Sequence, residues 1–321
     1  MFCQIGTGAD FGFETETDYG GSQVKVFYNP RMSTPSHGHS PSGTKPEAVV
    51  KDWEQRGLDI QIVDFEPATP VDLNSAHQLK YVTKVLTYEI NNGHGNKIES
   101  VTDSCLWTVG SMVAAARAAL TEGITCSPSS GFHHAGYAHN AGYCTFNGLI
   151  VAAQCLRKEG LIEKVGIIDC DAHYGDGTDD IIRTCGLKDN IHHWTFGREY
   201  GGRRKSYDFE PLLDRIRIEL TSMKSAGVEV ILYQAGADPH INDPLGGYML
   251  SMEMRLRDKY VFAMCDKLRL PVAWNLAGGY QQEPDGSIPK VLDLHRATAE
   301  EAIAVLNERS LDIPKPVGGV V

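Results

Sequence analysis

A hydrophobic segment of the chain runs directly into acidic and imidazole side chains in VGIIDCDAHYGDG, residues 165–177. Asp169, Asp171, His173 and Asp176 follow one another at intervals of two or three positions. A cluster of this kind at the end of a buried strand is costly unless a cation neutralises it. Asp and His side chains together suit Zn²⁺ or another divalent transition ion. The stretch therefore favours a metal site over the alternative, a set of capping and loop carboxylates.

Two further stretches could supply the rest of such a site. GFHHAGYAHNAGYC contains adjacent histidines, His133 and His134, which could point into one cavity or form a hydrogen-bonded pair in a loop. ILYQAGADPHINDPLGG ends a hydrophobic run in Asp238 and places Asp243 before Pro244. Either aspartate could complete a site of three protein ligands with one position open for water, as hydrolytic zinc needs. Asp238 could instead cap the turn that follows it.

The segment NLAGGY ends in Gly278, Gly279 and Tyr280. Two glycines permit a turn that would aim the phenol of Tyr280 across the mouth of a site. The plainer interpretation is a turn with an exposed tyrosine.

The elements that must position these residues follow a regular pattern, since hydrophobic runs of strand length alternate with segments of helix length. We expect strands at 24–29, 60–65, 165–169, 190–196, 228–234 and 271–276, and helices near 45–57, 69–90, 102–123, 147–159, 177–184, 208–226, 249–269 and 296–308. The alternation predicts an α/β fold with a central, mostly parallel sheet and helices on both faces. Each polar cluster falls at the carboxyl end of a strand, where open α/β sheets bind ligands.

Composition and charge narrow the class of protein. The 321 residues contain no linker-like interior segment, so we expect a single catalytic domain over 1–321, with an N-terminal arm and rim loops in 1–45. The net charge of −11 and the lack of a long Lys/Arg run argue against direct nucleic-acid binding and suit cationic substrates. Eight cysteines without a CxxC pair indicate reduced thiols in a cytoplasmic protein. No signal peptide or membrane-spanning stretch is evident.

The motifs stand in an order that resembles the histone deacetylase superfamily, which includes bacterial acetylpolyamine amidohydrolases. They are His133-His134-Ala135, Gly142-Tyr143-Cys144 with Phe146-Asn147, Asp169-x-Asp171-x-His173 with Gly175-Asp176-Gly177, Asp243, and Gly278-Gly279-Tyr280. The resemblance covers most of the chain from about residue 45 onward. Each motif is weak alone, but the ordered set is highly specific.

The resemblance implies a role for each of these residues. Asp171, His173 and Asp243 would hold zinc, which Fe²⁺ or Co²⁺ could replace. His133 and His134 would be the general base and acid, paired with Asp169 and Asp176 respectively, and Tyr280 would bind the carbonyl oxygen. Gly142, Tyr143 and Leu250 would line the substrate channel, although Leu250 could equally be a core residue. A structural potassium ion would lie beside residues 165–169. A histidine stands where the family usually has a serine that helps to bind this ion, so either His192 is displaced from that role or Thr195 substitutes.

Arginase-type enzymes share this fold and begin their metal motif in the same way, with Asp171-Ala172-His173. Their two-manganese site needs an aspartate two positions after the histidine, where this chain has Gly175. Their later Asp-x-Asp is also missing, because Asp238 is followed by Pro239 and His240. A single metal is therefore expected.

The chain departs from the deacetylase pattern in several places. SPSSGF replaces the usual Arg-Pro-Pro-Gly run before the histidines, and Tyr143 replaces a phenylalanine of the acyl channel. The expected function remains a zinc-dependent hydrolase that removes acetyl or a similar acyl group from acetyl-lysine or from an acetylated polyamine. A manganese ureohydrolase and a non-catalytic binding protein are the alternatives. The N-terminal arm could narrow the entrance through formation of a homo-oligomer.

Overall fold

The computed structural model describes residues 23–35, 40–201 and 209–312. Most of the expected N-terminal arm, residues 1–22, lies outside these ranges. Seven strands in the described residues form one sheet in the order β2-β1-β3-β7-β6-β4-β5, and every pairing is parallel. They are β1 Val24–Phe27, β2 Ile60–Val63, β3 Ile124–Ser130, β4 Val165–Asp169, β5 Ile191–Thr195, β6 Val230–Gln234 and β7 Val272–Ala277. The predicted α/β class is confirmed.

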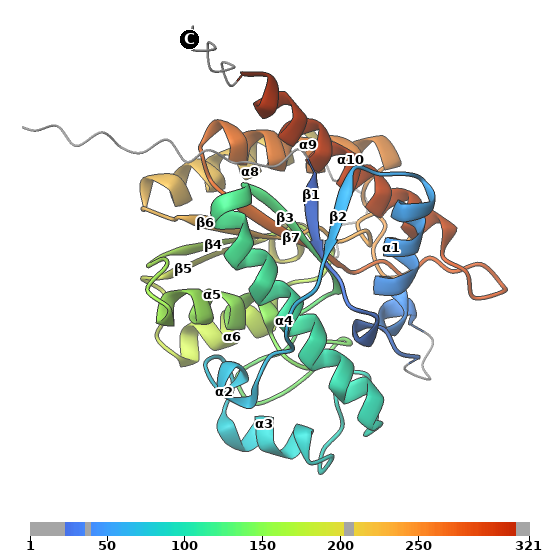
Figure 1. Cartoon of the computed structure of the whole chain (residues 1–321), viewed down its shortest axis with the longest axis vertical. Helices are drawn as coiled ribbons and strands as arrows, with labels where there is room; N and C mark the ends of the chain where they lie inside the picture. The colour runs from blue at the N-terminus through green and yellow to red at the C-terminus, as the bar shows by residue number, and fades with distance from the viewer. Residues whose placement is uncertain (1–22, 36–39, 202–208, 313–321) are drawn as a thin grey trace, which may run out of the picture.

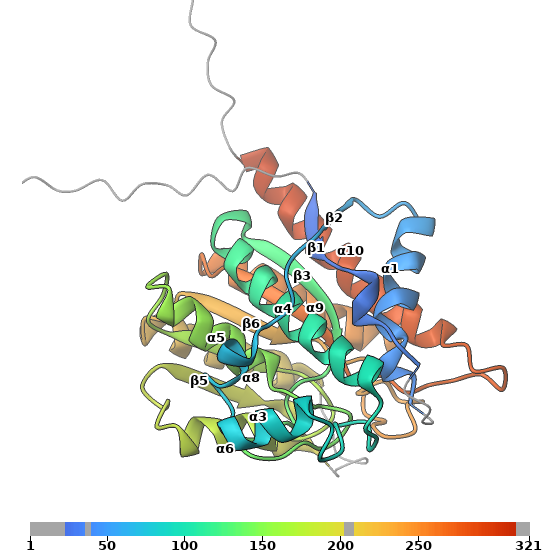
Figure 2. The same cartoon turned by 60° about the horizontal axis from the view of Figure 1, so that its bottom comes forward.

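Helices cover both faces of this sheet, as Figures 1 and 2 show. They are α1 Lys45–Gln55, α2 Pro70–Leu73, α3 Leu79–Leu86, α4 Glu99–Glu122, α5 Gly148–Lys158, α6 Asp176–Thr184, α7 Phe196–Tyr200, α8 Phe209–Ser225, α9 Ser251–Lys267 and α10 Pro289–Asp312. Side chains of α1, α8, α9 and α10 form one hydrophobic core with the sheet, and those of α3 to α6 form a second. Strands buried on both faces in this way explain the continuous apolar runs in the sequence.

The strand β3 was not predicted, although it lies near the middle of the sheet between β1 and β7. Its sequence, ITCSPSS, is mostly polar and contains a proline, which cannot donate a ladder hydrogen bond. The structure accommodates Pro128 where the pairing of β3 with β7 shifts register between Ser127 and Ser130. The hydroxyl groups are satisfied internally, since Ser127 lies 2.8 Å from Ser129 and accepts a hydrogen bond from Ser111. Hydrogen bonds between side-chain hydroxyl groups, rather than apolar side chains, therefore allow β3 to be buried.

The register of the sheet gathers polar residues at one edge. Asp169 at the end of β4 pairs with Thr195 at the end of β5 and with Gln234 at the end of β6. Because all the strands are parallel, the loops that follow them emerge on the same side. The candidate residues from four strands are therefore brought to one place.

A buried arginine of α9 ties two of these strand ends together. Arg257 is fully buried and donates hydrogen bonds to the carbonyl oxygens of Cys170 and Gly236, which follow β4 and β6. Its charge is balanced by Asp258 at 2.7 Å, which also accepts hydrogen bonds from Tyr233 and Thr298. A buried charge needs such partners, and this network fixes the backbone on which the site is built.

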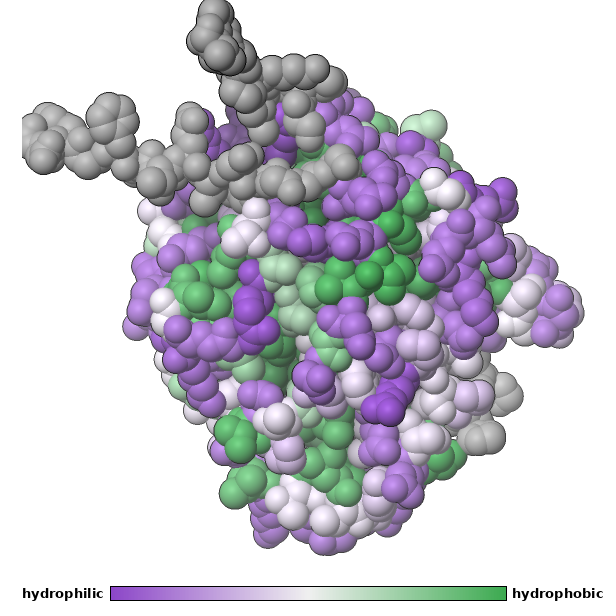
Figure 3. Space-filling model, in the orientation of Figure 1, coloured by the Kyte–Doolittle hydropathy of each residue, from purple (hydrophilic) through white to green (hydrophobic). Residues whose placement is uncertain are grey.

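None of the helices in the described ranges has the length and apolar character to cross a membrane. Figure 3 shows hydrophobic residues gathered at the end of the molecule where Figure 1 places α2 and α3. Val71 and Leu79 of these helices are exposed. The seven cysteines within the described residues are free thiols.

Candidate active site

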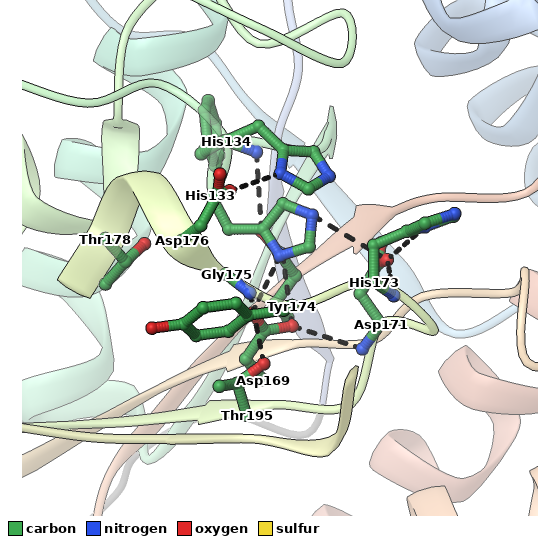
Figure 4. A network of polar contacts seen from close by, with 12 residues as sticks. His133, His134, Asp169, Asp171, His173, Tyr174, Gly175, Asp176, Thr178 and Thr195 are labelled. Atoms are coloured by element: carbon green, nitrogen blue, oxygen red, sulfur yellow. Dashed lines mark hydrogen bonds and ion pairs between the residues drawn. The ribbon is translucent and has the colours of Figure 1, made fainter. Parts of the chain in front are cut away.

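Four of the predicted catalytic residues meet at the carboxyl edge of the sheet: His133, His134, Asp169 and Asp176 (Figure 4). His133 and His134 lie in the loop after β3, and the residues from Asp169 to Asp176 link β4 to α6. The two imidazole rings lie side by side, with their centroids 4.1 Å apart. Each ring is held by a different carboxylate.

His133 is paired with Asp169, as the resemblance implies. The Nδ1 atom lies 2.7 Å from Oδ2 of Asp169, and both side chains are buried. This contact directs the other ring nitrogen, Nε2, toward Asp171, whose Oδ1 is 3.7 Å away. Burial opposes a charge on His133, but the carboxylates of Asp169 and Asp171 outweigh it and raise the pKa of His133 to about 9.

His134 is paired with Asp176 in the first turn of α6. Its Nδ1 atom lies 2.6 Å from Oδ1 of Asp176. Gly142 leaves room for the ring, because a Cβ atom at that position would lie 2.4 Å from Cδ2 of His134. Burial and the neighbouring His133 lower the pKa of His134. The adjacent histidines therefore differ in charge state when no metal is present, with His133 cationic and His134 neutral near pH 7.

Three side chains could hold a metal ion: Asp171, His173 and Asp238. The Nδ1 atom of His173 lies 3.1 Å from Oδ1 of Asp171 and 2.9 Å from Oδ2 of Asp238. The sequence predicted Asp243 as the third ligand; in the structure Asp238 lies in the group with Asp171 and His173, and the role of Asp243 as a ligand stays a prediction. The chain turns directly after β6, so Asp238 stays at the strand end while Asp243 continues along the loop.

The geometry of this group fits a cation. Oδ2 of Asp238 is buried. It forms an ion pair with His173 but no hydrogen bond with the described residues. Burial and the nearby Asp171 raise the pKa of Asp238 to about 7. Glycines keep the space open, since a Cβ atom at Gly278 would lie 2.4 Å from Oδ2 of Asp238. Two buried carboxylates with one imidazole form a donor set typical of Zn²⁺ and related ions.

Asp243 has a different set of contacts. Its Oδ2 accepts a hydrogen bond from the backbone N–H of Tyr280 at 2.7 Å, and its Oδ1 accepts one from the N–H of Leu245 at 3.0 Å. Asp243 therefore anchors the turn that carries Tyr280. The ring of Tyr280 lies with its centroid 6.4 Å from that of His173. Burial and the carboxylate of Asp171 raise the pKa of Tyr280 well above its usual range, so the phenol remains a proton donor.

A cavity of about 450 Å³ opens beside His134 and His173. Leu245, Tyr174 and Tyr248 also line it, whereas Leu250, predicted as a channel or core residue, is 54% exposed and is not part of this lining. Tyr143 stands next to Tyr280, with ring centroids 6.0 Å apart.

Two buried residues near the site were not predicted from the sequence. Lys45, at the start of α1, has no exposed surface; its Nζ donates to the carbonyl of Ala277 and faces the carboxylates of Asp238 and Asp171. His193 of β5 lies behind Asp169. Neither residue belongs to a recognisable motif, and only the fold reveals their positions.

Between the two residues considered for the potassium site, Thr195 pairs with Asp169, whereas His192 pairs with Gly166 and lies on the opposite face of β5.

Comparisons with known proteins point to one family. Residues 39–193 match the family model described as histone deacetylase domain. The chain is 23% identical to the acetoin utilization protein AcuC of Staphylococcus aureus over 225 residues, which cover 62% of this chain and 57% of AcuC. It is 26% identical to histone deacetylase 2 of Arabidopsis thaliana over 190 residues, which cover 54% of this chain and 49% of that protein. The matches thus span about half the length of these curated relatives.

Solved structures show the same fold. Acetylpolyamine aminohydrolase from Burkholderia pseudomallei superposes with a TM-score of 0.70 at 15% identity, over 88% of this chain and 99% of that one. The HDA15 HD domain superposes with a TM-score of 0.67 at 18% identity, over 90% and 89% of the two chains. At these identities the similarity concerns the fold alone. The family model therefore places residues 39–193 in the histone deacetylase family, and the solved structures show that the rest of the chain completes the same fold.

Proposed function

We propose that the chain is a metal-dependent amidohydrolase that removes acetyl or another small acyl group from an amine. The observation that carries this proposal is the pair of adjacent His–Asp contacts, 2.7 and 2.6 Å long, beside one Asp-His-Asp group. Amide hydrolysis needs a proton acceptor for water and a proton donor for the leaving amine, and neighbouring histidines can provide both. The acidic chain suits substrates with a cationic neighbour, such as acetyl-lysine or an acetylated polyamine.

Asp171, His173 and Asp238 would hold the metal, with Zn²⁺ as the first choice and Fe²⁺ or Co²⁺ as substitutes. When bound, such an ion supplies Lewis acidity, which lowers the pKa of water and polarises an amide carbonyl. A structural K⁺ beside β4 remains part of the proposal, with Thr195 as its candidate side chain.

In the proposed reaction, the side chains around the metal orient the histidines, transfer protons and bind the oxyanion. The carboxylates of Asp169 and Asp176 fix the two imidazole rings, so that each presents its Nε2 atom to the site. His133 would accept the proton of water, and His134 would deliver one to the leaving amine. Tyr280 would donate its phenolic proton in a hydrogen bond to the developing oxyanion.

The charge states of the two histidines make these roles testable. In the metal-free protein the pKa of His133 is raised and that of His134 is lowered, which is the reverse of the order that a base at His133 needs. A cation next to Asp171 would lower the pKa of His133, because His133 is close to that carboxylate. If that reversal does not occur, His134 alone exchanges protons while His133 contributes a fixed positive charge.

The test is hydrolysis of an acetyl-lysine peptide and of acetylputrescine by the zinc-loaded protein. We expect turnover of at least one substrate, and losses of about 100-fold or more in kcat for His134→Ala and Tyr280→Phe at unchanged zinc content. A preference for the peptide would indicate a protein deacetylase, and a preference for acetylputrescine a small-amine enzyme. Zinc-loaded, folded protein that hydrolyses neither substrate would count against the proposal.

A further inference from the structure

His193 occupies a buried position directly behind the His133–Asp169 pair. Its side chain is 1% exposed. Its Nδ1 atom lies 2.8 Å from Oδ1 of Asp179, and its Nε2 atom lies 3.7 Å from Oδ2 of Asp169. This Nε2 atom has no hydrogen-bond partner among the described residues, although it is inaccessible to solvent. The imidazole of His193 is therefore fixed at Nδ1 by Asp179, and its Nε2 points toward Asp169, the carboxylate that is paired with His133.

The contacts of Asp169 show what His193 contributes. A carboxylate has about four positions at which it can accept hydrogen bonds. Oδ1 of Asp169 accepts from the backbone N–H of Asp171 at 3.1 Å and from Nε2 of Gln234 at 3.2 Å. Oδ2 accepts from Nδ1 of His133 at 2.7 Å. The remaining position on Oδ2 faces His193, which is the fourth donor available to this fully buried carboxylate.

Asp179, which holds His193, is itself held by two other side chains. Oδ2 of Asp179 accepts hydrogen bonds from Tyr174 at 2.5 Å and from Arg198 at 3.0 Å. Asp179 belongs to the first turn of α6, the same turn that carries Asp176 and thereby holds His134. One helical turn thus supports both catalytic histidines, directly through Asp176 and indirectly through Asp179.

We propose that His193 is a positioning residue: held by Asp179, it donates a hydrogen bond to Asp169 and keeps that carboxylate fixed against His133. This inference rests on the proposed function. Both ring nitrogens of His193 face carboxylates, so the cationic ring, which donates from each nitrogen, matches its surroundings. Burial opposes that charge, but Asp169 and Asp179 outweigh it and raise the pKa of His193. The 3.7 Å separation would shorten on ligand binding, as catalytic contacts in free enzymes often do.

The surroundings leave His193 little freedom to adopt another role. A Cβ atom at Gly175 would lie 2.6 Å from Oδ2 of Asp169 and 3.0 Å from Cε1 of His193, so this glycine is what allows the ring and the carboxylate to approach. A residue that merely filled space here would not need its second nitrogen directed at Asp169.

Three variants separate positioning from packing. Asp179→Asn keeps the shape and removes the negative charge opposite Nδ1 of His193, which weakens a charge-assisted contact from Nε2 to Asp169. His193→Phe keeps the ring without a donor, and His193→Gln restores an amide donor. Arg198→Gln is the matched control, since it removes a half-exposed partner of Asp179 and leaves both His193 contacts in place.

In the zinc-loaded enzyme we expect Asp179→Asn and His193→Phe to lower kcat by about 10- to 100-fold. KM and zinc affinity should change by less than about threefold, because losing an interaction that acts in the transition state lowers kcat without weakening the binding of substrate. His193→Gln should recover part of kcat, and Arg198→Gln should change it by less than about threefold. Folded, zinc-loaded Asp179→Asn and His193→Phe with wild-type kcat would overturn the proposal, as would a loss that follows zinc affinity alone.

A second readout does not depend on activity. The ring N–H that His133 donates to Asp169 should give a far-downfield proton resonance in the zinc-loaded protein, because the contact is short and charge-assisted. Asp179→Asn and His193→Phe should shift this resonance, whereas Arg198→Gln should not. If wild-type protein hydrolyses no acetylated amine but the resonance responds, the proposed function fails and the positioning role stands. If the enzyme is active and the resonance is unmoved, the positioning role fails.

Discussion

At the scale of single residues, the main question about the candidate metal site is whether Asp238 or Asp243 is its third ligand. The structure places Asp238 in the group with Asp171 and His173, while both oxygens of Asp243 accept backbone hydrogen bonds. We expect Asp238→Asn to weaken zinc binding by about 100-fold or more, because it removes a charged ligand. Competition with a fluorescent chelator measures this affinity.

Asp243→Asn is the matched comparison, since it changes one charge on the same loop. We expect a smaller effect on zinc affinity and a larger one on kcat, because Asp243 orients Tyr280 through a backbone hydrogen bond. The opposite ranking of zinc affinities would show that the loop moves and that Asp243 is the ligand in the metal-bound protein.

The sequence could predict most of this site because its chemistry is local. His133, His134, Asp169, Asp171 and His173 lie in two short stretches with distinctive spacing, and the fold brings them together. Asp238 and Asp243 could not be ranked, since both follow the same strand and only the path of the turn separates them. Buried Lys45 and His193 could not be predicted either, because their neighbours come from distant parts of the chain.

At the scale of elements, a buried histidine links the loop between α2 and α3 to the segment between β3 and α5, which carries His133 and His134. The predicted helix over 69–90 is divided in the structure, and His77 lies in the break. Its Nδ1 atom lies 2.8 Å from the carbonyl oxygen of Gly136, and its Nε2 accepts from the N–H of Asn147 at 2.8 Å. This arrangement requires a neutral ring that donates at Nδ1 and accepts at Nε2. Burial lowers the pKa of His77 to about 4.

The stability of the protein should therefore fall in mild acid. The unfolded chain binds a proton at the usual histidine pKa of about 6.5, whereas the folded protein resists it until about pH 4. The contribution of His77 is present above pH 6.5 and is lost as the pH falls from 6.5 toward 4, amounting to roughly 3 kcal/mol when the loss is complete. Denaturant unfolding at pH 7 and pH 5 measures the change.

His77→Gln provides the control for this prediction. The amide of glutamine can accept from Asn147 and donate to Gly136, but it does not titrate. The variant should lose less stability than wild type between pH 7 and pH 5. An identical pH dependence in both proteins would assign the effect to other groups.

The same scale shows why pattern recognition from sequence missed one strand. Four of the expected strands owe their signal to continuous apolar runs, whereas β3 is polar and is stabilised by side-chain hydroxyls and by a register shift at Pro128. Hydrogen bonds between residues far apart in sequence leave no periodic signal. The strand that precedes His133 and His134 was thus the one that hydrophobic patterning could not reveal.

At the scale of the whole molecule, the parallel sheet concentrates negative charge at one edge. Asp169, Asp171 and Asp238 are all buried there, and Lys45 and Arg257 are buried close to them. Lys45 and Arg257 offset part of this negative charge, and a bound divalent ion would offset more of it. A metal that binds only the folded protein adds about 2.7 kcal/mol of stability at a free concentration of 100 times Kd. We expect the Tm to rise with zinc concentration and to fall when a chelator is added.

Lys45→Met tests whether the buried charge of Lys45 changes the stability that the protein gains when zinc binds. In the metal-free protein, the ammonium group of Lys45 is attracted to the carboxylates of Asp238, Asp171 and Asp243. A bound divalent ion would reverse much of that attraction, because it neutralises those carboxylates and repels Lys45. The cost of burying Lys45 is the same in both states, so it cancels when the zinc-induced change in Tm is compared between proteins. Lys45→Met should therefore show a larger zinc-induced rise in Tm than wild type, measured by scanning calorimetry at matched free zinc. An equal or smaller rise would mean that the ion binds where Lys45 does not sense it, and that Asp171, His173 and Asp238 are not its ligands.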